Sequence, residues 1–333
     1  MSESLVSDPL TESVLRSYDL LREGCGRYEL ANSCLLELTG EDRKAWLQGQ
    51  ITNDLRKTQV GDSIAFCVCS PTGQMLAACD LWALEDRFLI RSHKASLPAL
   101  LERCTHMVVM EDVHHADLTP SYKLVSVQGP TATRELKELM ELPTLDAGTL
   151  EYEGASVICL RSNRTGLGGW DLLLPTDAKK AIKKLEAAFA PIDEHAFNIA
   201  RLEAGIPRYG VDMNERTLPP EMGSLFESRN VSYNKGCYTG QEVLMRIHSR
   251  GHTNKTWMAL VSDQPMQAGD IVSHANRADA GVVTTGLDSP RYGYIAGAMI
   301  RNEAAFDGET VTVKGPDGDF DAEVRPFPLL LLG

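Results

Sequence analysis

The sequence predicts an α+β protein with two α+β layers and a small C-terminal antiparallel β-barrel. The layers are predicted by a repeated pattern. An apolar strand that ends in glycine, at residues 35–40 and again at 123–129, comes before a polar helix start and further strands. The barrel is predicted by a change in the sequence pattern after Gly251, where short apolar stretches alternate with Gly, Asp and Pro. These observations give three expected domains, which are residues 1–120, 121–252 and 253–333.

The first layer is expected to begin with a helix that starts at Asp8 and Pro9 and ends at Gly24, because Asp is a good N-cap and Pro fits the first turn. Ser70 to Gly73 has the sequence of a β-turn, with Pro at its second position and Gly at its fourth. The other elements expected here are strands at 34–38, 63–69, 74–84, 88–90 and 107–110, a helix that carries Ala45, Leu47 and Ile51, and a helix at 95–103.

The second layer is expected to contain strands at 123–129, 156–161 and 169–174 and a helix at 176–190. A further helix at 193–204 is expected to end at Gly205, with Pro207 beyond it. The barrel strands are expected at 257–261, 271–273, 281–285, 294–299 and 310–314, and the apolar end at 328–333 is predicted to be a buried strand.

Composition and charge limit the classes of function. The chain has 333 residues, with 33 basic and 46 acidic side chains and a formal net charge of −13. This balance argues against general nucleic-acid binding, although it leaves room for a local basic pocket that holds a small anion. We expect a cytoplasmic protein without membrane contact, because no secretory signal and no apolar run of ~18 residues is found. Eight irregularly spaced cysteines favour reduced thiols over a disulfide framework.

The segment KGCYTGQE, residues 235–242, predicts thiol chemistry at Cys237. A thiol reacts as the thiolate, and the nearby cation of Lys235 would lower the pKa of the thiol. The alternative is that Cys237 is a small buried apolar residue, as most free cysteines are. The surrounding Gly, Tyr, Gln and Glu residues have little value in an apolar core, so the segment favours a functional role.

Basic residues alternate after this segment, at Arg246, His248, Arg250 and His252. If the segment is extended, these side chains share one face and, with Lys255, could hold a carboxylate-rich ligand. The alternative is a solvated strand face.

A metal site is not expected. The two histidines have no cysteine or carboxylate at a persuasive spacing. Cys67, Cys69 and Cys79 could meet in space, but a cluster or zinc site normally has four ligands. We expect these three cysteines to be core residues.

Two further stretches carry candidate ligand contacts. Arg201, near the end of a predicted helix, could bind an anion through two parallel hydrogen bonds, or it could form a surface pair with Glu203. Residues 163–169 contain three glycines, which let a backbone approach a flat ligand closely. Asp171 follows them and could accept two N–H groups of a pterin-like ring. The alternative for this stretch is a simple hairpin turn with an edge strand.

Together these residues resemble a known family, and the similarity covers most of the chain. KGCYTGQE and the basic tail at 246–251 resemble the folate-binding YgfZ branch of the glycine-cleavage T-protein superfamily. Residues 40–54 resemble its first helix motif, 164–171 its glycine-rich turn and pterin-binding carboxylate, and 201–205 its shared helix.

The resemblance implies a three-domain cloverleaf, with two ferredoxin-like α+β layers and a C-terminal β-barrel around a central folate pocket. It places folate binding in residues 1–120 and the cysteine motif in 121–252. The implied function is a tetrahydrofolate-dependent accessory role in the assembly or repair of iron–sulfur proteins, with Cys237 as the essential thiol beside Lys235. The residues predicted to contact the tetrahydrofolate are Asp171, Arg201, Tyr238, Gln241 and Arg246. The expected partners are folate and iron–sulfur client proteins, and the protein is expected to be a monomer.

The sequence departs from the true aminomethyltransferases at a pair of acidic positions, where Ala77 and Ala78 stand. General acid–base help is commonly worth ~100- to 10,000-fold, so its loss argues against glycine-cleavage chemistry. Asp80 lies two residues after Ala78 and so faces the same side of the strand, which makes it a weak substitute for the missing acidic pair. Asp171 is also shorter than the glutamate of the true T-proteins.

Three functions stay open. The first is the accessory role, in which Cys237 acts on or transiently holds an iron–sulfur intermediate; one cysteine cannot hold a stable cluster alone. The alternative is a folate-dependent aminomethyltransferase or demethylase, a one-carbon enzyme that would need an acid–base residue facing the folate. The third is a plain folate-binding scaffold with a structural cysteine.

Overall fold

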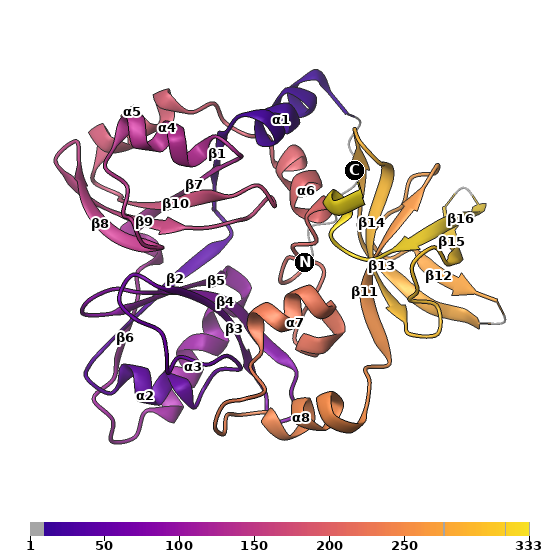
Figure 1. Cartoon of the computed structure of the whole chain (residues 1–333), viewed down its shortest axis with the longest axis horizontal. Coiled ribbons are helices and arrows are strands. Elements are labelled where there is room, and N and C mark those ends of the chain that lie inside the picture. Colours follow the sequence, from indigo (N-terminus) through magenta and orange to yellow (C-terminus); the bar gives the residue numbers. More distant parts are fainter. Residues whose placement is uncertain (1–9, 276, 317, 333) are drawn as a thin grey trace.

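Two five-stranded sheets and a closed six-stranded barrel make up the protein (Figure 1). The computed structural model describes residues 10–275, 277–316 and 318–332. All strand pairs recorded between the named strands are antiparallel. The predicted α+β class with a C-terminal antiparallel barrel is confirmed.

The first sheet has the strand order β3-β4-β5-β2-β6. Its strands are β2 (Ser33–Thr39), β3 (Ser63–Cys69), β4 (Met75–Ala83), β5 (Phe88–His93) and β6 (His114–Asp117). Two helices, α2 (Arg43–Gln48) and α3 (Leu97–Met107), cover one face of this sheet. The burial of Phe66, Leu47 and Leu100 in this layer explains why the alternating strands and the helical apolar stripe belong together.

The second sheet has the order β1-β7-β10-β9-β8. Its strands are β1 (Gly26–Glu29), β7 (Tyr122–Gln128), β8 (Ala147–Tyr152), β9 (Ala155–Arg161) and β10 (Gly169–Pro175). Helices α4 (Ala132–Leu139) and α5 (Lys179–Ala188) pack on its outer face, where Leu136 and Leu185 are fully buried beside Trp170.

The two sheets pack against each other through their remaining faces. Trp82, Leu35 and Leu89 of the first sheet meet Leu160 and Leu173 of the second in one apolar cluster. Figure 1 shows the resulting order of layers, with helices outside and the two sheets inside. Both sheets are therefore buried on both faces, which fixes the positions of the strand ends and of the turns that follow them.

The barrel closes in the order β11-β14-β13-β12-β15-β16. Its strands are β11 (Lys255–Ser262), β12 (Ile271–His274), β13 (Arg277–Ser289), β14 (Gly293–Arg301), β15 (Thr310–Gly315) and β16 (Gly318–Arg325). Alternate side chains such as Leu260, Ala298 and Val313 fill its interior, as the pleat of a half-buried strand requires.

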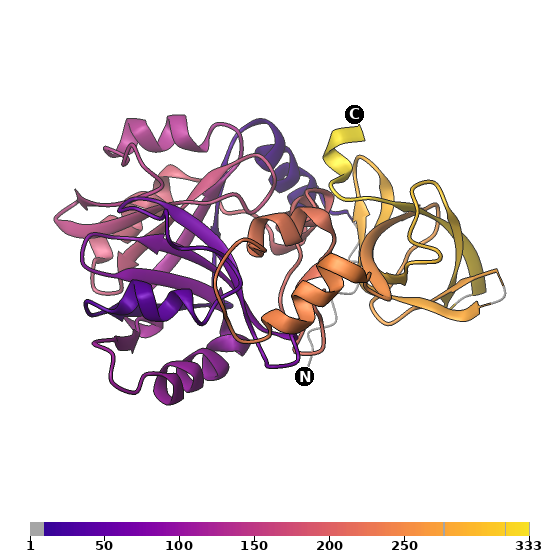
Figure 2. The same ribbon diagram turned by 60° about the horizontal axis from the view of Figure 1, so that its bottom comes forward.

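A group of helices joins the sheets to the barrel. They are α1 (Glu12–Glu23), α6 (Glu194–Glu203), α7 (Ser224–Asn230) and α8 (Gln241–Arg250), with the short 3-10 turns η3 (Pro219–Met222) and η4 (Leu329–Leu332). Two further 3-10 turns lie within the sheet layers, η1 (Lys94–Ser96) between β5 and α3 and η2 (Thr119–Ser121) between β6 and β7. Figure 2 shows α7 and α8, in orange, between the sheets and the barrel. The fully buried Glu203 of α6 accepts hydrogen bonds from Tyr18 of α1 (3.0 Å) and Ser289 of β13 (2.6 Å), so that α6 is fixed from both sides.

Some expected elements differ in the structure. The start predicted at Asp8 and Pro9 lies outside the described residues, and α1 begins at Glu12, where the Thr11 hydroxyl accepts the N–H of Val14 (3.3 Å). The strand predicted at 107–110 is wrong because α3 continues to Met107. The strand predicted at 328–333 is wrong over its described part, which forms η4.

Two segments cross the expected domain boundary at residue 120. β1 precedes the first sheet in the chain but pairs with β7 in the second. The KGCYTGQE segment, expected in the second layer, contacts the first layer through Lys235. The division into three domains otherwise stays a prediction.

Candidate functional site

A cavity of about 730 Å³ lies in the middle of the molecule. Its wall includes residues of β1, β4, β5, α6 and α7, the 163–167 turn and the C-terminal segment. Its volume falls within the range of ~300–1,000 Å³ that is typical of small-molecule sites. The elements that meet here come from both sheets and are far apart in the chain, so the cavity forms only when these parts are packed together.

One part of the wall is aromatic. The rings of Tyr28 and Phe197 are stacked, with centroids 4.1 Å apart and an angle of 11° between the planes. Phe226 and Met213 add further apolar surface to the lining. Burial, together with the nearby Glu194 carboxylate, raises the pKa of Tyr28 to about 12, so its hydroxyl stays neutral and able to donate. A flat apolar surface of this kind suits a planar ring.

The cavity is positively charged although the chain is acidic. The charged lining residues are Arg91, Arg164, Arg201, Arg208 and Arg229 against Glu29, Asp80 and Glu194. These five arginines exceed the three carboxylates, whereas the whole chain carries a formal net charge of −13. An excess of guanidinium groups at a cleft favours an anionic over a cationic ligand there.

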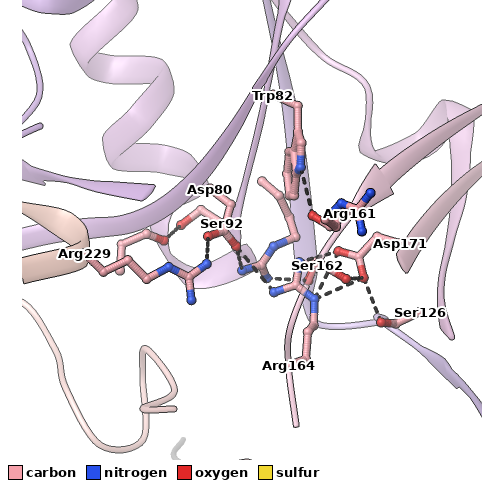
Figure 3. A network of polar contacts seen from close by, with 12 residues as sticks. Asp80, Trp82, Ser92, Ser126, Arg161, Ser162, Arg164, Asp171 and Arg229 are labelled. Atoms are coloured by element: carbon pink, nitrogen blue, oxygen red, sulfur yellow. Dashed lines mark hydrogen bonds and ion pairs between the residues drawn. The ribbon is translucent and has the colours of Figure 1, made fainter. Parts of the chain in front are cut away.

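Asp80, on β4, is the centre of a cluster of arginines (Figure 3). Its Oδ2 lies 2.7 Å from Arg91 Nη2 and 3.4 Å from Arg164 Nη1, and its Oδ1 lies 3.2 Å from Arg229 Nη2. Burial raises the pKa of Asp80, but Arg91, Arg229 and Arg164 outweigh burial and hold this pKa well below its usual range. The carboxylate therefore stays ionised and fully paired, which makes it a poor general acid or base near neutral pH.

Arg164 is aimed at the cavity by the turn after β9. The Asn163 side-chain oxygen accepts the N–H groups of Gly166 (2.8 Å) and Gly168 (3.1 Å). Both glycines have positive φ, of +89° and +87°, which other residues rarely adopt. The glycine-rich turn thus has a structural use, which is to position Arg164.

Asp171 lies behind Arg164. Its carboxylate accepts from Arg164 Nε (3.0 Å), from the Ser126 hydroxyl (2.7 Å) and from the Ser162 hydroxyl (2.8 Å), and it also pairs with Arg164 Nη2. Asp171 is only 1% exposed and, within the described residues, is not among those that line the cavity. The geometry makes Asp171 a support for Arg164, and its predicted direct contact with a pterin stays a prediction.

Arg201 lines the cavity and is 3% exposed. Its Nη1 donates to Asp212 Oδ2 (2.8 Å) and its Nε donates to Asn198 Oδ1 (2.8 Å). The buried Nη2 finds no hydrogen-bond partner among the residues described. Burial lowers the pKa of Arg201, although Asp212 opposes this effect. A buried guanidinium nitrogen without an acceptor is costly, so this side chain is poised for an acceptor group of a ligand.

The orientation of Arg201 depends on the barrel. Asp212 holds Arg201 through Oδ2, while its Oδ1 accepts from the hydroxyls of Thr284 (2.9 Å) and Thr285 (2.7 Å) on β13. The barrel therefore supports the cavity wall without lining it there.

The thiol loop, residues 235–240, lies away from these groups. Cys237 is exposed, whereas the other seven cysteines are buried. In the described parts of the chain, Cys237 is not a lining residue of the cavity.

Lys235 is a tether for the thiol loop. Its Nζ donates to the backbone oxygens of Gln48 (2.6 Å), Ile51 (2.6 Å) and Asn53 (2.8 Å), which uses all three donors of the ammonium group. Burial lowers the pKa of Lys235 to about 8. Each N–H points to a carbonyl at or just after the end of α2, and the predicted role of Lys235 beside Cys237 stays a prediction.

The other predicted contacts also lie on this side. Tyr238 is buried beneath the Lys235 ammonium, which is 5.0 Å from its ring centroid. Gln241 Nε2 contacts the backbone oxygen of Lys235 (3.4 Å), and Arg246 pairs with Glu242 on the surface (3.1 Å). As far as the described residues go, none of these side chains lines the central cavity. The structure thus separates the predicted residues into two places.

The extended conformation considered for residues 246–252 is not adopted up to Arg250, because α8 covers Gln241–Arg250. Residues two apart on a helix point in nearly opposite directions, so Arg246 and His248 do not share a face. His248 instead stacks on Tyr233, with centroids 3.7 Å apart. The apolar spacing of Val243, Leu244 and Ile247 explains the helix, since Leu244 is fully buried.

Cys67, Cys69 and Cys79 are core residues, as predicted. Burial raises the pKa of Cys69 to about 12 and that of Cys67 well above its ordinary value. Among the residues that can be described, no group of three or more His, Cys, Asp or Glu side chains is placed to hold a metal. In the same part of the chain, no helix combines the length and apolar character needed to cross a membrane.

Sequence reasoning missed several cavity residues. Arg91 lies directly opposite Asp80 on neighbouring strands, so the pair follows from the hairpin register, which the sequence leaves open. The stacked pair of Tyr28 and Phe197 joins β1 to α6 and has no local signal. Arg229 reaches Asp80 from α7, which was not predicted.

Comparisons with known proteins agree with this architecture. The sequence model of the family described as "GCVT N-terminal domain" matches residues 5–227. Relatives include an aminomethyltransferase of Exiguobacterium sibiricum, 26% identical over 306 residues, which cover 90% of this chain and 84% of the relative. An aminomethyltransferase of Staphylococcus epidermidis is 24% identical over 313 residues, with 91% and 86% covered. The crystal structure of the glycine cleavage system aminomethyltransferase T from Bartonella henselae has a TM-score of 0.83 at 19% identity, covering 97% of this chain and 91% of that chain.

Proposed function

Because the chain belongs to the family of the GCVT N-terminal domain, we propose that its central cavity binds a tetrahydrofolate for one-carbon chemistry of the aminomethyltransferase type. The observation that carries this proposal is the cavity of about 730 Å³, in which a stacked aromatic wall and a surplus of arginines meet. A reduced folate offers a flat ring system at one end and carboxylates at the other. The naming of the curated relatives as aminomethyltransferases supports this function better than the iron–sulfur accessory role.

Different residues of the cavity wall would contact different parts of the folate. The outer face of the stacked pair of Tyr28 and Phe197 would pack against the ring system, and the stacking would hold that face in place. Arg201 would donate its unpaired Nη2 to an oxygen of the folate. The enclosing sheets and α6 would exclude water from the reacting end, which strengthens each of these interactions.

The cavity-facing side of β4 limits the chemistry. Ala78 lines the cavity where a carboxylate would be expected in a transferase, and Asp80 beside it is paired with arginines. We therefore expect binding and orientation of the folate to be strong and acid–base help from β4 to be absent. Transfer of an aminomethyl group should be slow, because such help is commonly worth ~100- to 10,000-fold.

Titration calorimetry with tetrahydrofolate tests the proposal. We expect one site per chain and a rise in the melting temperature on binding, because a ligand that binds only the folded state stabilises it. Folded protein that gives neither heat nor a thermal shift at millimolar folate would overturn it. A coupled assay of one-carbon transfer to or from a small amine then measures the activity itself.

The iron–sulfur accessory role of the YgfZ branch is the second candidate. One observation favours it, which is that Cys237 is the exposed member of eight cysteines and lies on a tethered loop. A lone thiol would need further cluster ligands from a client protein. We propose to compare iron–sulfur enzyme activities in cells that lack this chain and carry either the natural form or Cys237→Ser. Equal support by both forms would remove this candidate. In either role we expect a cytoplasmic monomer.

A further inference from the structure

A second cavity, of about 230 Å³, lies beside the central one. Its wall comes from β3, β4, the turn after β9, and α7. The residues that line both cavities are Ala65, Asp80, Asn163, Arg164 and Arg229. A group bound in the small cavity would therefore be a direct neighbour of a ligand in the large one.

Hydrogen-bond donors remain available in this small cavity. Arg229 contacts Asp80 through Nη2 at 3.2 Å, and its side chain is 53% exposed, so it remains accessible to a ligand. The side-chain oxygen of Asn163 is used by Gly166 and Gly168, which leaves its NH₂ group as a donor. Both side chains line the cavity and thus keep donors that no contact among the described residues uses.

The hydroxyls and acceptors around the small cavity are already engaged. Ser63 donates to Asp146 (2.8 Å) and Ser162 donates to Asp171 (2.8 Å). The Asp80 carboxylate is surrounded by arginines, as Figure 3 shows. A positively charged, donor-rich wall with few open acceptors selects an anionic acceptor over a cation or a neutral donor.

Arg161 also lines this cavity but is committed elsewhere. Its Nε pairs with Asp146 at 2.9 Å, and its guanidinium lies over the ring of Trp170, 4.6 Å from the centroid. Its backbone oxygen accepts the indole N–H of Trp82 (3.2 Å). The guanidinium most available to a ligand is therefore that of Arg229.

We propose that the small cavity is a subsite for an aliphatic carboxylate, bound by Arg229 and the amide of Asn163. The cavity lies below the ~300 Å³ lower end of sites for drug-sized ligands, so it suits a group of glutamate size. A carboxylate and a guanidinium match in shape and charge. The carboxylate can belong to a glutamyl extension of the folate in the central cavity, a form that rests on the proposed function, or to a free small dicarboxylate.

Calorimetry on the full chain distinguishes these sources. The ligands are tetrahydrofolate with one glutamate, tetrahydrofolate with three glutamates, and glutarate. If the carboxylate is a glutamyl extension, the triglutamyl form binds about tenfold more tightly than the monoglutamyl form. In Arg229→Gln this gain is lost, so the triglutamyl and monoglutamyl forms bind that variant with about equal affinity. If the carboxylate is a free molecule, glutarate binds the natural chain but not Arg229→Gln.

Two variants serve as controls. Arg216→Gln removes one positive charge from an exposed position that lines neither cavity, and it should keep the preference for the triglutamyl form. Arg229→Lys keeps the charge but loses the planar fork, and it should keep only part of the gain. A gain that falls equally in Arg216→Gln would mean a general electrostatic effect and would overturn the subsite.

The failure of the subsite and that of the proposed function differ. If the monoglutamyl form binds, but neither extra glutamates nor glutarate gives an affinity that depends on Arg229, the subsite is wrong and the proposed function stands. If no folate binds, the proposed function is wrong and glutarate alone decides the subsite. Binding that Arg229→Gln abolishes supports it, and no binding overturns it.

Discussion

The central cavity and the thiol loop each contain a buried cation, yet they use it in opposite ways. Arg201 in the cavity wall keeps one buried nitrogen without an acceptor among the described residues. Lys235 in the thiol loop gives all three donors to backbone oxygens. An unsatisfied donor is available to a ligand, whereas a satisfied one holds the chain in place. The comparison agrees with the proposed ligand binding at the cavity and describes the thiol loop as a fixed support for an exposed sulfur.

The largest effect is expected for Asp80→Asn. This change leaves Arg91, Arg164 and Arg229 without their shared carboxylate, so the free energy of unfolding should fall by about 3 kcal/mol at pH 7. Urea denaturation measures it. The exposed Asp86→Asn is the matched control and should change stability by less than about 0.5 kcal/mol. Equal effects of the two variants would mean that the arginine cluster contributes nothing to the cavity wall.

The difference in stability between the natural chain and Asp80→Asn should depend on pH. The pKa of Asp80 is lower in the folded state than in the unfolded chain, so the unfolded state binds more protons at acidic pH. The stabilisation from Asp80 is therefore complete above about pH 4, the ordinary pKa of an aspartate, and is lost as the pH falls further. The stability gap between the natural chain and Asp80→Asn should narrow below that pH. A constant gap down to about pH 2 would contradict the shift.

Lys235→Met should lower the free energy of unfolding by about 2 kcal/mol, because three backbone oxygens lose a charged donor. It should also change the rate at which a thiol reagent labels Cys237, since the loop loses its tether. Lys255→Met, at a position with only a 3.9 Å contact to Glu221, is the control. Unchanged stability and labelling in Lys235→Met would show that the loop is held by other contacts.

Arg201→Gln should weaken tetrahydrofolate binding by at least about 1.5 kcal/mol, roughly tenfold, because a charge-assisted hydrogen bond is lost. Calorimetry measures the affinity, and circular dichroism verifies that the variant is folded. Arg201→Lys keeps the charge and should recover part of the affinity. An affinity equal to that of the natural chain would assign Arg201 to structure alone.

The smallest effect is expected for Cys237→Ser. The side chain is exposed and, within the described residues, lies outside the cavity lining, so stability should change by less than about 0.5 kcal/mol. Tetrahydrofolate affinity should not change. A large loss of folate binding in this variant would mean that the thiol loop contributes to binding at the central cavity, contrary to the separation seen in the structure.

Local patterns predicted much of the fold. The alternation at 63–69 matches β3, and the predicted barrel strands match β11 to β15 in order. Short or glycine-rich strands such as β1 and β16 were missed, because four polar residues or a run of Gly and Asp carry little apolar periodicity. In α8, the alternating cations would share one face only on an extended strand, whereas the helical spacing of the apolar residues decided the structure.

From the sequence, a residue of the site could be predicted only where its type and a distinctive local stretch were enough to mark it as a candidate. Arg201 and the glycine-rich turn at 163–169 do face or shape the cavity. The carbonyl partners of Lys235 are more than 180 residues away along the chain, so no local signal could show that its donors are already used. The Asp80 cluster likewise needs strand register and the placement of α7.

Asp212 has one further consequence. Its carboxylate joins Arg201 to Thr284, and the hydroxyl of Thr284 also accepts the indole N–H of Trp257 (3.2 Å). A relay of three hydrogen bonds therefore runs from the cavity wall to a tryptophan in the barrel. A ligand that hydrogen-bonds to the Arg201 guanidinium should therefore alter the environment of the Trp257 indole. We expect the fluorescence emission of Trp257 to report whether the cavity is occupied.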